Sequence, residues 1–249
     1  MIDERDFRVG DVLSVACPFT LARVERGLRW NEVAVRWPWW EIDTENEFAH
    51  WNGIVALSVK SGGSTSPEVD TELFRTDPPP EHLEAGDFCR VGVPPTLVHV
   101  TDIAHHDPPL QTPWLPHPTR TVTLLRRGLS YQEFPDETHL DGSGYGIHPG
   151  DGIPFTFELL MRPYAFLQLG DEVADADGRA WRFDGPWDWA PFDGEPPGAG
   201  PMWPLALLTR SGSPRSAEDS ETVAASTASG SHQETVRSWM AMTDASPTP

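Results

Sequence analysis

The sequence predicts an all-β protein of tandem or pseudo-symmetric small β-barrels, SH3-like or similar, with long loops and a short C-terminal helix. Three observations predict this fold. The 249 residues include 26 prolines and 21 glycines, a composition typical of many turns and short elements. Short β-branched segments lie between the turns, and no stretch of ten or more residues before position 210 has helical period. The third observation is an internal repeat.

The repeat aligns GDVLSVACPFTLARV (10–24) with GDFCRVGVPPTLVHV (86–100), and seven of the fifteen positions are identical without a gap. This similarity indicates duplication of one supersecondary unit. A weaker third copy spans 170–183, whereas the Gly-Asp pair at 150–151 starts nothing similar. We expect each glycine to adopt the positive φ of a turn, and each aspartate to accept a backbone N–H before a strand. The alternative is that these aspartates bind a metal together.

Alternation and β-branched content predict the individual strands. They fall near 11–16, 20–25, 31–37, 53–59, 89–91, 96–103, 120–126, 155–161, 172–175, 180–184 and 204–209.

These strands group into units separated by long loops. Residues 1–60 form the first β unit, and 61–80 are a linker or flap. Residues 81–210 hold the second and third β units, with an insertion at 128–154. Loops of this length inside a domain are usually functional or mobile.

The composition changes to Ser, Ala, Thr and Glu after Arg210. Ser216 with Asp219 and Ser231 with Glu234 are two capping-box signatures, and an apolar face follows the second. We expect 211–249 to be a flexible tail with a short helix near 232–243, which either docks on its own barrel or binds a partner.

Charge and cysteine content exclude several classes of function. The formal net charge is −20, which makes nucleic-acid binding unfavourable. No N-terminal apolar region and no run of 18 apolar residues occur, so we expect neither a signal peptide nor a membrane span. Cys17 and Cys89 match no disulfide framework and no metal spacing. They are expected to be reduced, buried thiols of a cytoplasmic protein, with a catalytic cysteine as the alternative.

Tryptophan-rich segments are the candidate ligand-binding sites. RWPWWEID (36–43) surrounds one proline with three indoles and continues into acid, and GPWDW (185–189) occupies the corresponding place in the third copy. Duplicated aromatic pairs are more often core than ligand sites, but one exposed indole of each pair would mark recognition. The candidate ligand-binding residues are Trp37, Trp39, Trp40, Glu41, Asp43, Trp187 and Trp189.

Acidic and histidine-rich segments are the candidate metal-binding or catalytic sites. HVTDIAHHD (99–107) offers the metal candidates His99, Asp102, His105 and His106, although no spacing matches a known ligand signature. The repeat makes His99 look like a solvent-facing strand position. The alternating acids of 41–47 favour a solvated edge over a metal site. The loop 131–151 holds further acids and histidines.

Several segments resemble hypothetical proteins of high-GC actinobacteria, namely DVLSVACPFT, RWPWWEID, ELFRTDPPP and RPYAFLQLGDEVADADGRAWRFDG. The resemblance covers most of the chain and implies no activity, cofactor or catalytic residue.

The sequence therefore predicts a non-catalytic cytoplasmic interaction module. Exposed tryptophans and an acidic rim would bind a protein or peptide partner, with no nucleic acid, no membrane and no cofactor. The alternative is a metal-dependent hydrolase with a divalent metal, acting on a small substrate through residues of 99–107 and 131–151. Carbohydrate binding on the tryptophans is a third hypothesis, which a cytoplasmic location disfavours.

Overall fold

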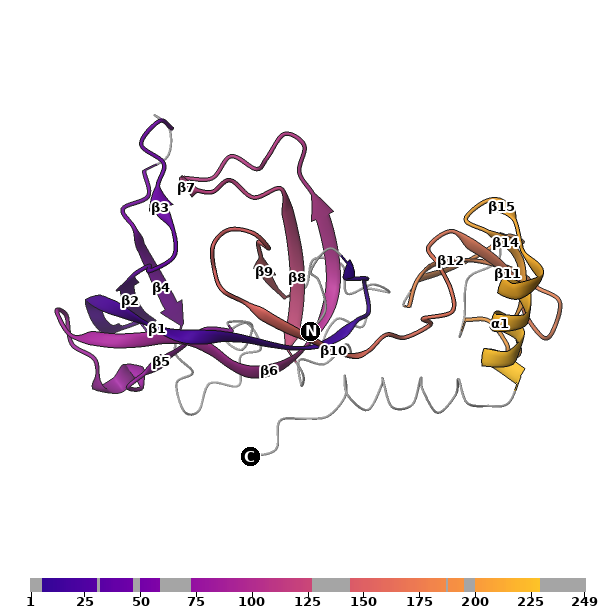
Figure 1. Cartoon of the computed structure of the whole chain (residues 1–249). Coiled ribbons are helices and arrows are strands. Elements are labelled where there is room, and N and C mark those ends of the chain that lie inside the picture. The colour runs from indigo at the N-terminus through magenta and orange to yellow at the C-terminus, as the bar shows by residue number, and fades with distance from the viewer. Residues whose placement is uncertain are drawn as a thin grey trace.

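The computed structural model describes residues 6–30, 32–46, 50–58, 73–126, 144–186, 188–194 and 200–228 (Figure 1). Strands dominate these residues, so the all-β class is confirmed. The elements are β1 (Val12–Arg29), β2 (Glu32–Arg36), β3 (Glu41–Ile42), β4 (Ile54–Ser58), β5 (Arg75–Asp77), the 3-10 helix η3 (Pro80–His82), β6 (Phe88–His105), β7 (Trp114–Leu115), β8 (Arg120–Arg126), β9 (Tyr145–Ile147), β10 (Thr156–Met161), β11 (Asp171–Ala174), β12 (Ala180–Gly185), β13 (Asp188–Pro191), β14 (Ala206–Arg210), β15 (Ser213–Pro214) and α1 (Ala217–Ala228).

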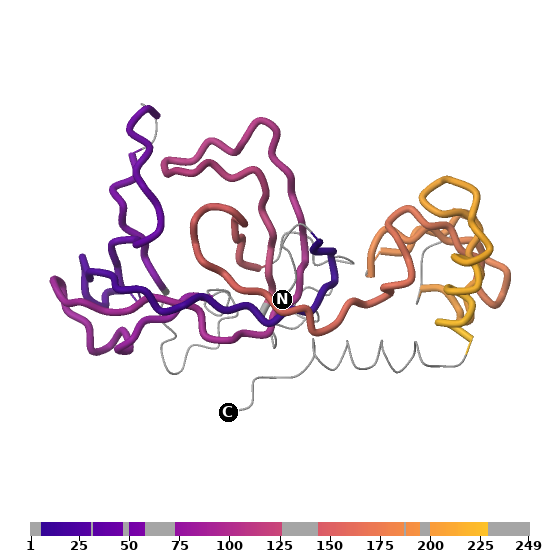
Figure 2. Tube along the Cα trace, viewed as in Figure 1, coloured from indigo at the N-terminus to yellow at the C-terminus, as the bar shows by residue number. Residues whose placement is uncertain are grey.

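The strands form three sheets. The largest is a curled sheet in the order β4-β2-β1-β6-β8-β9, with β10 also paired to β1 and β5 to β6. A separate five-stranded sheet has the order β13-β12-β11-β14-β15, and α1 lies against it at the right of Figure 2. The third is the short β3–β7 pair. Whether the curled sheet divides into small barrels stays a prediction.

The two copies of the repeat pair with each other. Each forms an 18-residue strand, β1 or β6, and the two run antiparallel. The register of the pair follows the repeat: when each residue of an opposed pair is replaced by its equivalent in the other copy, the two equivalents also oppose each other. Leu13 opposes Val98, and the repeat maps this pair onto Cys89 opposite Ala22. The duplicated segments therefore share one interface at the centre of the large sheet. The shorter strands add to it on both sides.

Each copy begins with the predicted Gly-Asp turn, in which the glycine has positive φ and donates its N–H to a neighbouring strand. The φ angles are 90° at Gly10, 98° at Gly86 and 81° at Gly170. The accepting carbonyls are those of Val100, Val24 and Phe183, at 2.7, 2.8 and 2.8 Å. The following aspartate accepts the backbone N–H three residues upstream, at 2.8–2.9 Å in all three copies. Because the turn is satisfied locally, these aspartates need no metal to explain them.

Two hydrophobic cores lie beneath the sheets. The larger contains the inner residues of β1, β6 and β8 together with Trp37, Leu73 and Phe74. The smaller includes Tyr164, Trp181 and Trp189. Both cysteines are buried and free of disulfides, as expected.

The prediction of a flexible stretch after Arg210 is wrong. Residues 213–214 form β15, and α1 starts after Ser216, whose Oγ accepts the N–H of Asp219 at 3.0 Å. The helix docks through fully buried Val223 and through Thr227, whose Oγ1 accepts the N–H of Leu205 at 3.1 Å. The capping box of Ser216 and Asp219 therefore marks the start of a helix. The expected helix near 232–243 lies outside the described residues.

A buried ion pair joins the first Gly-Asp turn to the chain that leads into the second core. The Asp11 carboxylate is fully buried and accepts Arg162 Nε and Nη2, each at 2.8 Å. A Cβ at Gly10 would lie 2.3 Å from Pro186 Cγ, whereas a Cβ at Gly86 would meet nothing within 4 Å. The first turn is therefore a packed junction, and its equivalent in the second copy is open.

We predict that Gly10→Ala destabilises the chain more than Gly86→Ala does. Both substitutions place a Cβ at positive φ, at a cost of about 1–2 kcal/mol. Only the first also forces Pro186 to move, which adds about 1–3 kcal/mol of overpacking. Urea unfolding of both variants measures the difference. Equal losses would contradict the packed junction.

Candidate functional site

Trp37 is a core residue and not an exposed platform. Its side chain is 4% exposed, and its ring centroid lies 4.8 Å from that of Trp39 and 4.9 Å from that of Phe74. Trp39 and Trp40 are half-buried against the same core. None of these three indoles lies open to solvent in the way a free binding platform requires.

Trp40 also belongs to a second aromatic group, which includes a residue that the sequence did not single out. It stacks on Trp114 of β7, with centroids 4.3 Å apart and planes within 7°. Trp51 contacts both rings edge-on, at 6.0 and 5.9 Å. We call Trp40, Trp51 and Trp114 the indole triad. It anchors the β3–β7 pair on the large core.

The third-copy candidates do not provide an exposed pair either. Trp189 is buried in the smaller core, and Trp187 lies outside the described residues. The exposed indole that the structure does show is Trp30, which is 81% exposed at the tip of the β1–β2 hairpin. Its φ is 57°, and the Arg29 guanidinium lies 5.6 Å from its ring centroid. The sequence around this hairpin tip has no pattern that would mark Trp30 as a recognition residue.

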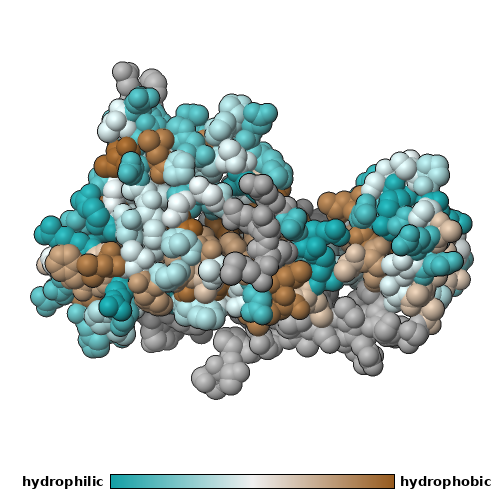
Figure 3. Space-filling model, in the orientation of Figure 1, coloured by the Kyte–Doolittle hydropathy of each residue, from teal (hydrophilic) through white to brown (hydrophobic). Residues whose placement is uncertain are grey.

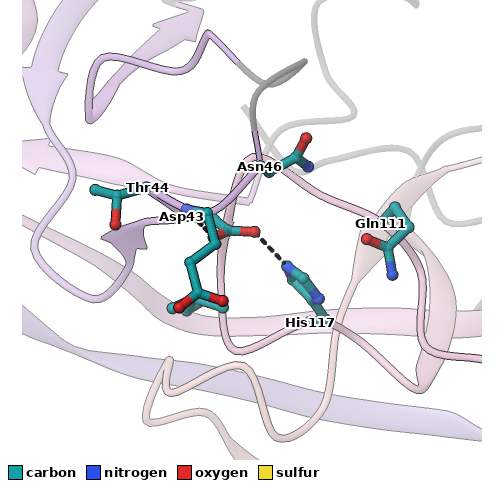
Figure 4. A pocket seen from close by; sticks show the side chains of 7 residues that line it. Asp43, Thr44, Asn46, Gln111 and His117 are labelled. Atoms are coloured by element: carbon teal, nitrogen blue, oxygen red, sulfur yellow. Dashed lines mark hydrogen bonds and ion pairs between the residues drawn. The ribbon is translucent and has the colours of Figure 1, made fainter.

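An open pocket of about 640 Å³ lies where β3 and the turn after it face the β7 segment (Figure 4). In the β3–β7 ladder Glu41 opposes Leu115, and Ile42 opposes Trp114. Leu115 lines the pocket, whereas Trp114 stacks on Trp40. The ladder thus separates a polar pocket from the indole triad. The pocket is lined by Asp43, Thr44, Glu45, Asn46, Gln111, Leu115 and His117.

Asp43 holds this pocket together. Its side chain is 6% exposed, and Oδ2 lies 3.0 Å from His117 Nε2. Oδ1 accepts the Glu45 N–H at 3.0 Å, and the Asp43 N–H donates to Pro113 O at 3.1 Å. The prediction of a solvated acidic edge is therefore wrong for Asp43. It agrees with Glu41 and Glu45, which are exposed.

The four metal candidates are dispersed. His99 is 1% exposed, so the prediction that it faces solvent is wrong. His105 is exposed at the end of β6, and Asp102 and His106 are half-buried. Within the residues that the structure describes, no group of three or more His, Cys, Asp or Glu side chains is placed to hold a metal ion. Most of the loop 131–151 lies outside those residues.

His106 takes part in a different contact, which the sequence did not reveal. Its Nε2 lies 2.8 Å from Thr121 Oγ1, and the same hydroxyl lies 3.2 Å from His148 Nδ1. Burial lowers the pKa of His148, so its ring is neutral at pH 7. Three separate segments build this contact, and no spacing within one segment could predict it.

The cysteines are poor nucleophiles. Burial raises the pKa of the Cys17 thiol to about 11, and burial also raises that of Cys89. The reactive thiolate is therefore almost absent at neutral pH, which argues against the alternative of a catalytic cysteine.

No family model, no curated protein and no solved structure matches this chain. Among the described residues, no helix is both long and apolar enough to cross a bilayer.

We predict that Trp40→Phe costs less stability than Trp51→Phe. Trp40 Nε1 is buried without a hydrogen-bond acceptor, whereas Trp51 Nε1 donates to Ile54 O at 3.0 Å. Replacing Trp51 therefore loses a further contribution of about 1 kcal/mol. Trp40→Ala should cost about 3 kcal/mol, because it removes the stacked ring. Thermal and urea unfolding measure all three. If Trp40→Phe costs as much as Trp40→Ala, stacking on Trp114 is not the stabilising contact.

Proposed function

We propose that the protein is a non-catalytic interaction module whose pocket beside β3 and β7 receives a basic side chain of a protein or peptide partner. The open pocket of about 640 Å³, with Asp43 and Glu45 in its lining, carries this proposal. Pockets that combine a few placed polar groups with apolar surface are the default recognition sites of proteins.

The charges favour a basic group. Asp43 is already bound by His117, but Glu41 and Glu45 form no ion pair within the described residues. Leu115 offers apolar surface to the stem of a lysine or arginine. Its cationic end would meet Glu45 of the pocket lining and Glu41, which lies opposite Leu115 in the β3–β7 ladder. The net charge of −20 attracts basic partners at longer range.

A cytoplasmic location is part of the proposal. The two buried, unpaired cysteines support it, because a reducing compartment keeps thiols in this state. We also propose that the two halves of the large sheet are duplicated barrel-like units, which the exchange of equivalent positions between β1 and β6 supports.

Charge reversal at the rim tests the pocket. Synthetic peptides in which Lys alternates with Leu should bind the full chain in fluorescence polarisation, whereas peptides of Glu and Leu should not bind at this site. Glu41→Lys combined with Glu45→Lys should weaken binding about tenfold, the effect of losing and reversing two exposed charge pairs. Glu84→Lys, an exposed acid elsewhere, is the matched control. Equal affinity for all three chains would contradict the pocket as the site.

The alternative is a metal-dependent hydrolase, favoured by the meeting of His106 and His148 at Thr121. Elemental analysis of the purified full chain separates the two proposals. We expect far less than one zinc, manganese or iron per chain. A stoichiometric metal that is lost in the His105→Ala, His106→Ala double variant would contradict the interaction module and support the hydrolase.

A further inference from the structure

The outer face of the β1–β6 pair exposes large apolar side chains beside two arginines. Phe19, Leu21 and Phe88 are 40%, 63% and 65% exposed. Leu21 lies opposite Arg90, and Arg23 lies opposite Phe88. Directly opposed residues of an antiparallel pair share a face, so these side chains form one surface. We call Phe19, Leu21, Arg23, Phe88 and Arg90 the outer patch. In the view of Figure 3, brown apolar surface lies beside teal hydrophilic surface at the left of the molecule.

The repeat supplies an internal comparison for the outer patch. It aligns Leu21 with Leu97, Phe88 with Val12 and Arg23 with His99. In the other half of the sheet Val12 and His99 are 0% and 1% exposed, and Leu97 is half-buried. The same face is therefore covered in one half of the pseudo-symmetric sheet and open in the other. Exposed apolar surface of this kind marks an interaction site.

The charge of the outer patch indicates what covers it. Neither Arg23 nor Arg90 forms an ion pair in the part of the chain that the structure describes, although Asp77 lies opposite Arg90 on β5. Two unpaired guanidinium groups on a chain of net charge −20 form a local basic spot. Asp77 offsets part of this charge, and Glu25 on β1 is already paired with Arg36, so positive charge remains in excess at the outer patch. Acids farther than about 8 Å are largely screened at physiological ionic strength.

We propose that the outer patch is a second interaction surface, which docks an acidic segment of a partner protein. Apolar side chains of that segment cover Leu21 and Phe88, and its carboxylates pair with Arg23 and Arg90. An anionic membrane is disfavoured as the occupant, because its extended surface would also meet the excess acids of the chain. This surface is separate from the acidic pocket and selects the opposite charge.

Peptide binding to the full chain tests the proposal. The probes are synthetic peptides in which Glu alternates with Leu, Glu with Ser, or Lys with Leu. We expect the Glu-Leu peptide to bind in fluorescence polarisation, and the Glu-Ser peptide to bind at least tenfold more weakly because it lacks apolar side chains. Phosphatidylcholine–phosphatidylserine vesicles should not retain the protein in sedimentation.

Variants locate the binding. Arg23→Glu with Arg90→Glu, and separately Phe88→Ser, should each lower the affinity for the Glu-Leu peptide at least tenfold. The control for charge reversal away from the outer patch is Arg182→Glu, an exposed arginine of β12 that is paired with Asp184. The pocket variant Glu41→Lys with Glu45→Lys should leave this affinity unchanged or raise it slightly, so failure of one surface does not imply failure of the other.

Other outcomes overturn the proposal. Absence of Glu-Leu binding, or equal loss in the Arg182→Glu control, removes the outer patch as an acidic-segment site. Retention on the vesicles would identify a membrane as the occupant. A dimer in analytical ultracentrifugation that Phe88→Ser dissociates would identify a second copy of the chain. If only a chain ending at Ala228 binds the Glu-Leu peptide, residues 229–249 are the occupant.

Discussion

The antiparallel pairing of β1 with β6 is the constraint on which the rest of the structure depends. These two strands have 18 residues each, and the other strands of the large sheet add to one of them directly or through a neighbour. Their inner side chains form much of the larger core. Because the two strands are far apart in the sequence, the sheet forms only when a long loop closes, and no shorter part of the chain can build it.

The repeat predicted the duplicated unit, but not that its copies pair with each other. Sequence similarity indicates that two segments share a conformation, but it does not indicate which strands they pair with. Alternation also predicted separate strands at 11–16 and 20–25, and at 89–91 and 96–103, on either side of the prolines at 18 and 94. In the structure β1 continues past Pro18, where the register with β6 is irregular between Val15 and Thr20. Proline has no backbone N–H to donate, and such an irregularity lets it lie within a strand without breaking a ladder hydrogen bond. One long strand was therefore predicted as two short ones.

The candidate site was partly predictable for similar reasons. Glu41 and Asp43 were singled out from one acidic segment. His117 and Trp114 lie more than 70 residues later, between prolines, with no pattern around them. Tertiary contact alone joins them to Asp43 and Trp40. The cluster of tryptophans at 37–40 was visible in the sequence, but the burial of each indole depends on Phe74 and Trp114, which local periodicity cannot supply.

The exchange of equivalent positions across β1 and β6 has an evolutionary consequence. A single ancestral copy would have left half of its long strand as an open edge, and the natural cover for that edge is the same edge of a second copy. In the present chain the β1–β6 register has the two-fold relation of such an interface within one polypeptide. Two halves of one chain need not have the same sequence, so each half can change its outer face without altering the other. The packed turn at Gly10 and the open turn at Gly86 are one such difference between the two halves.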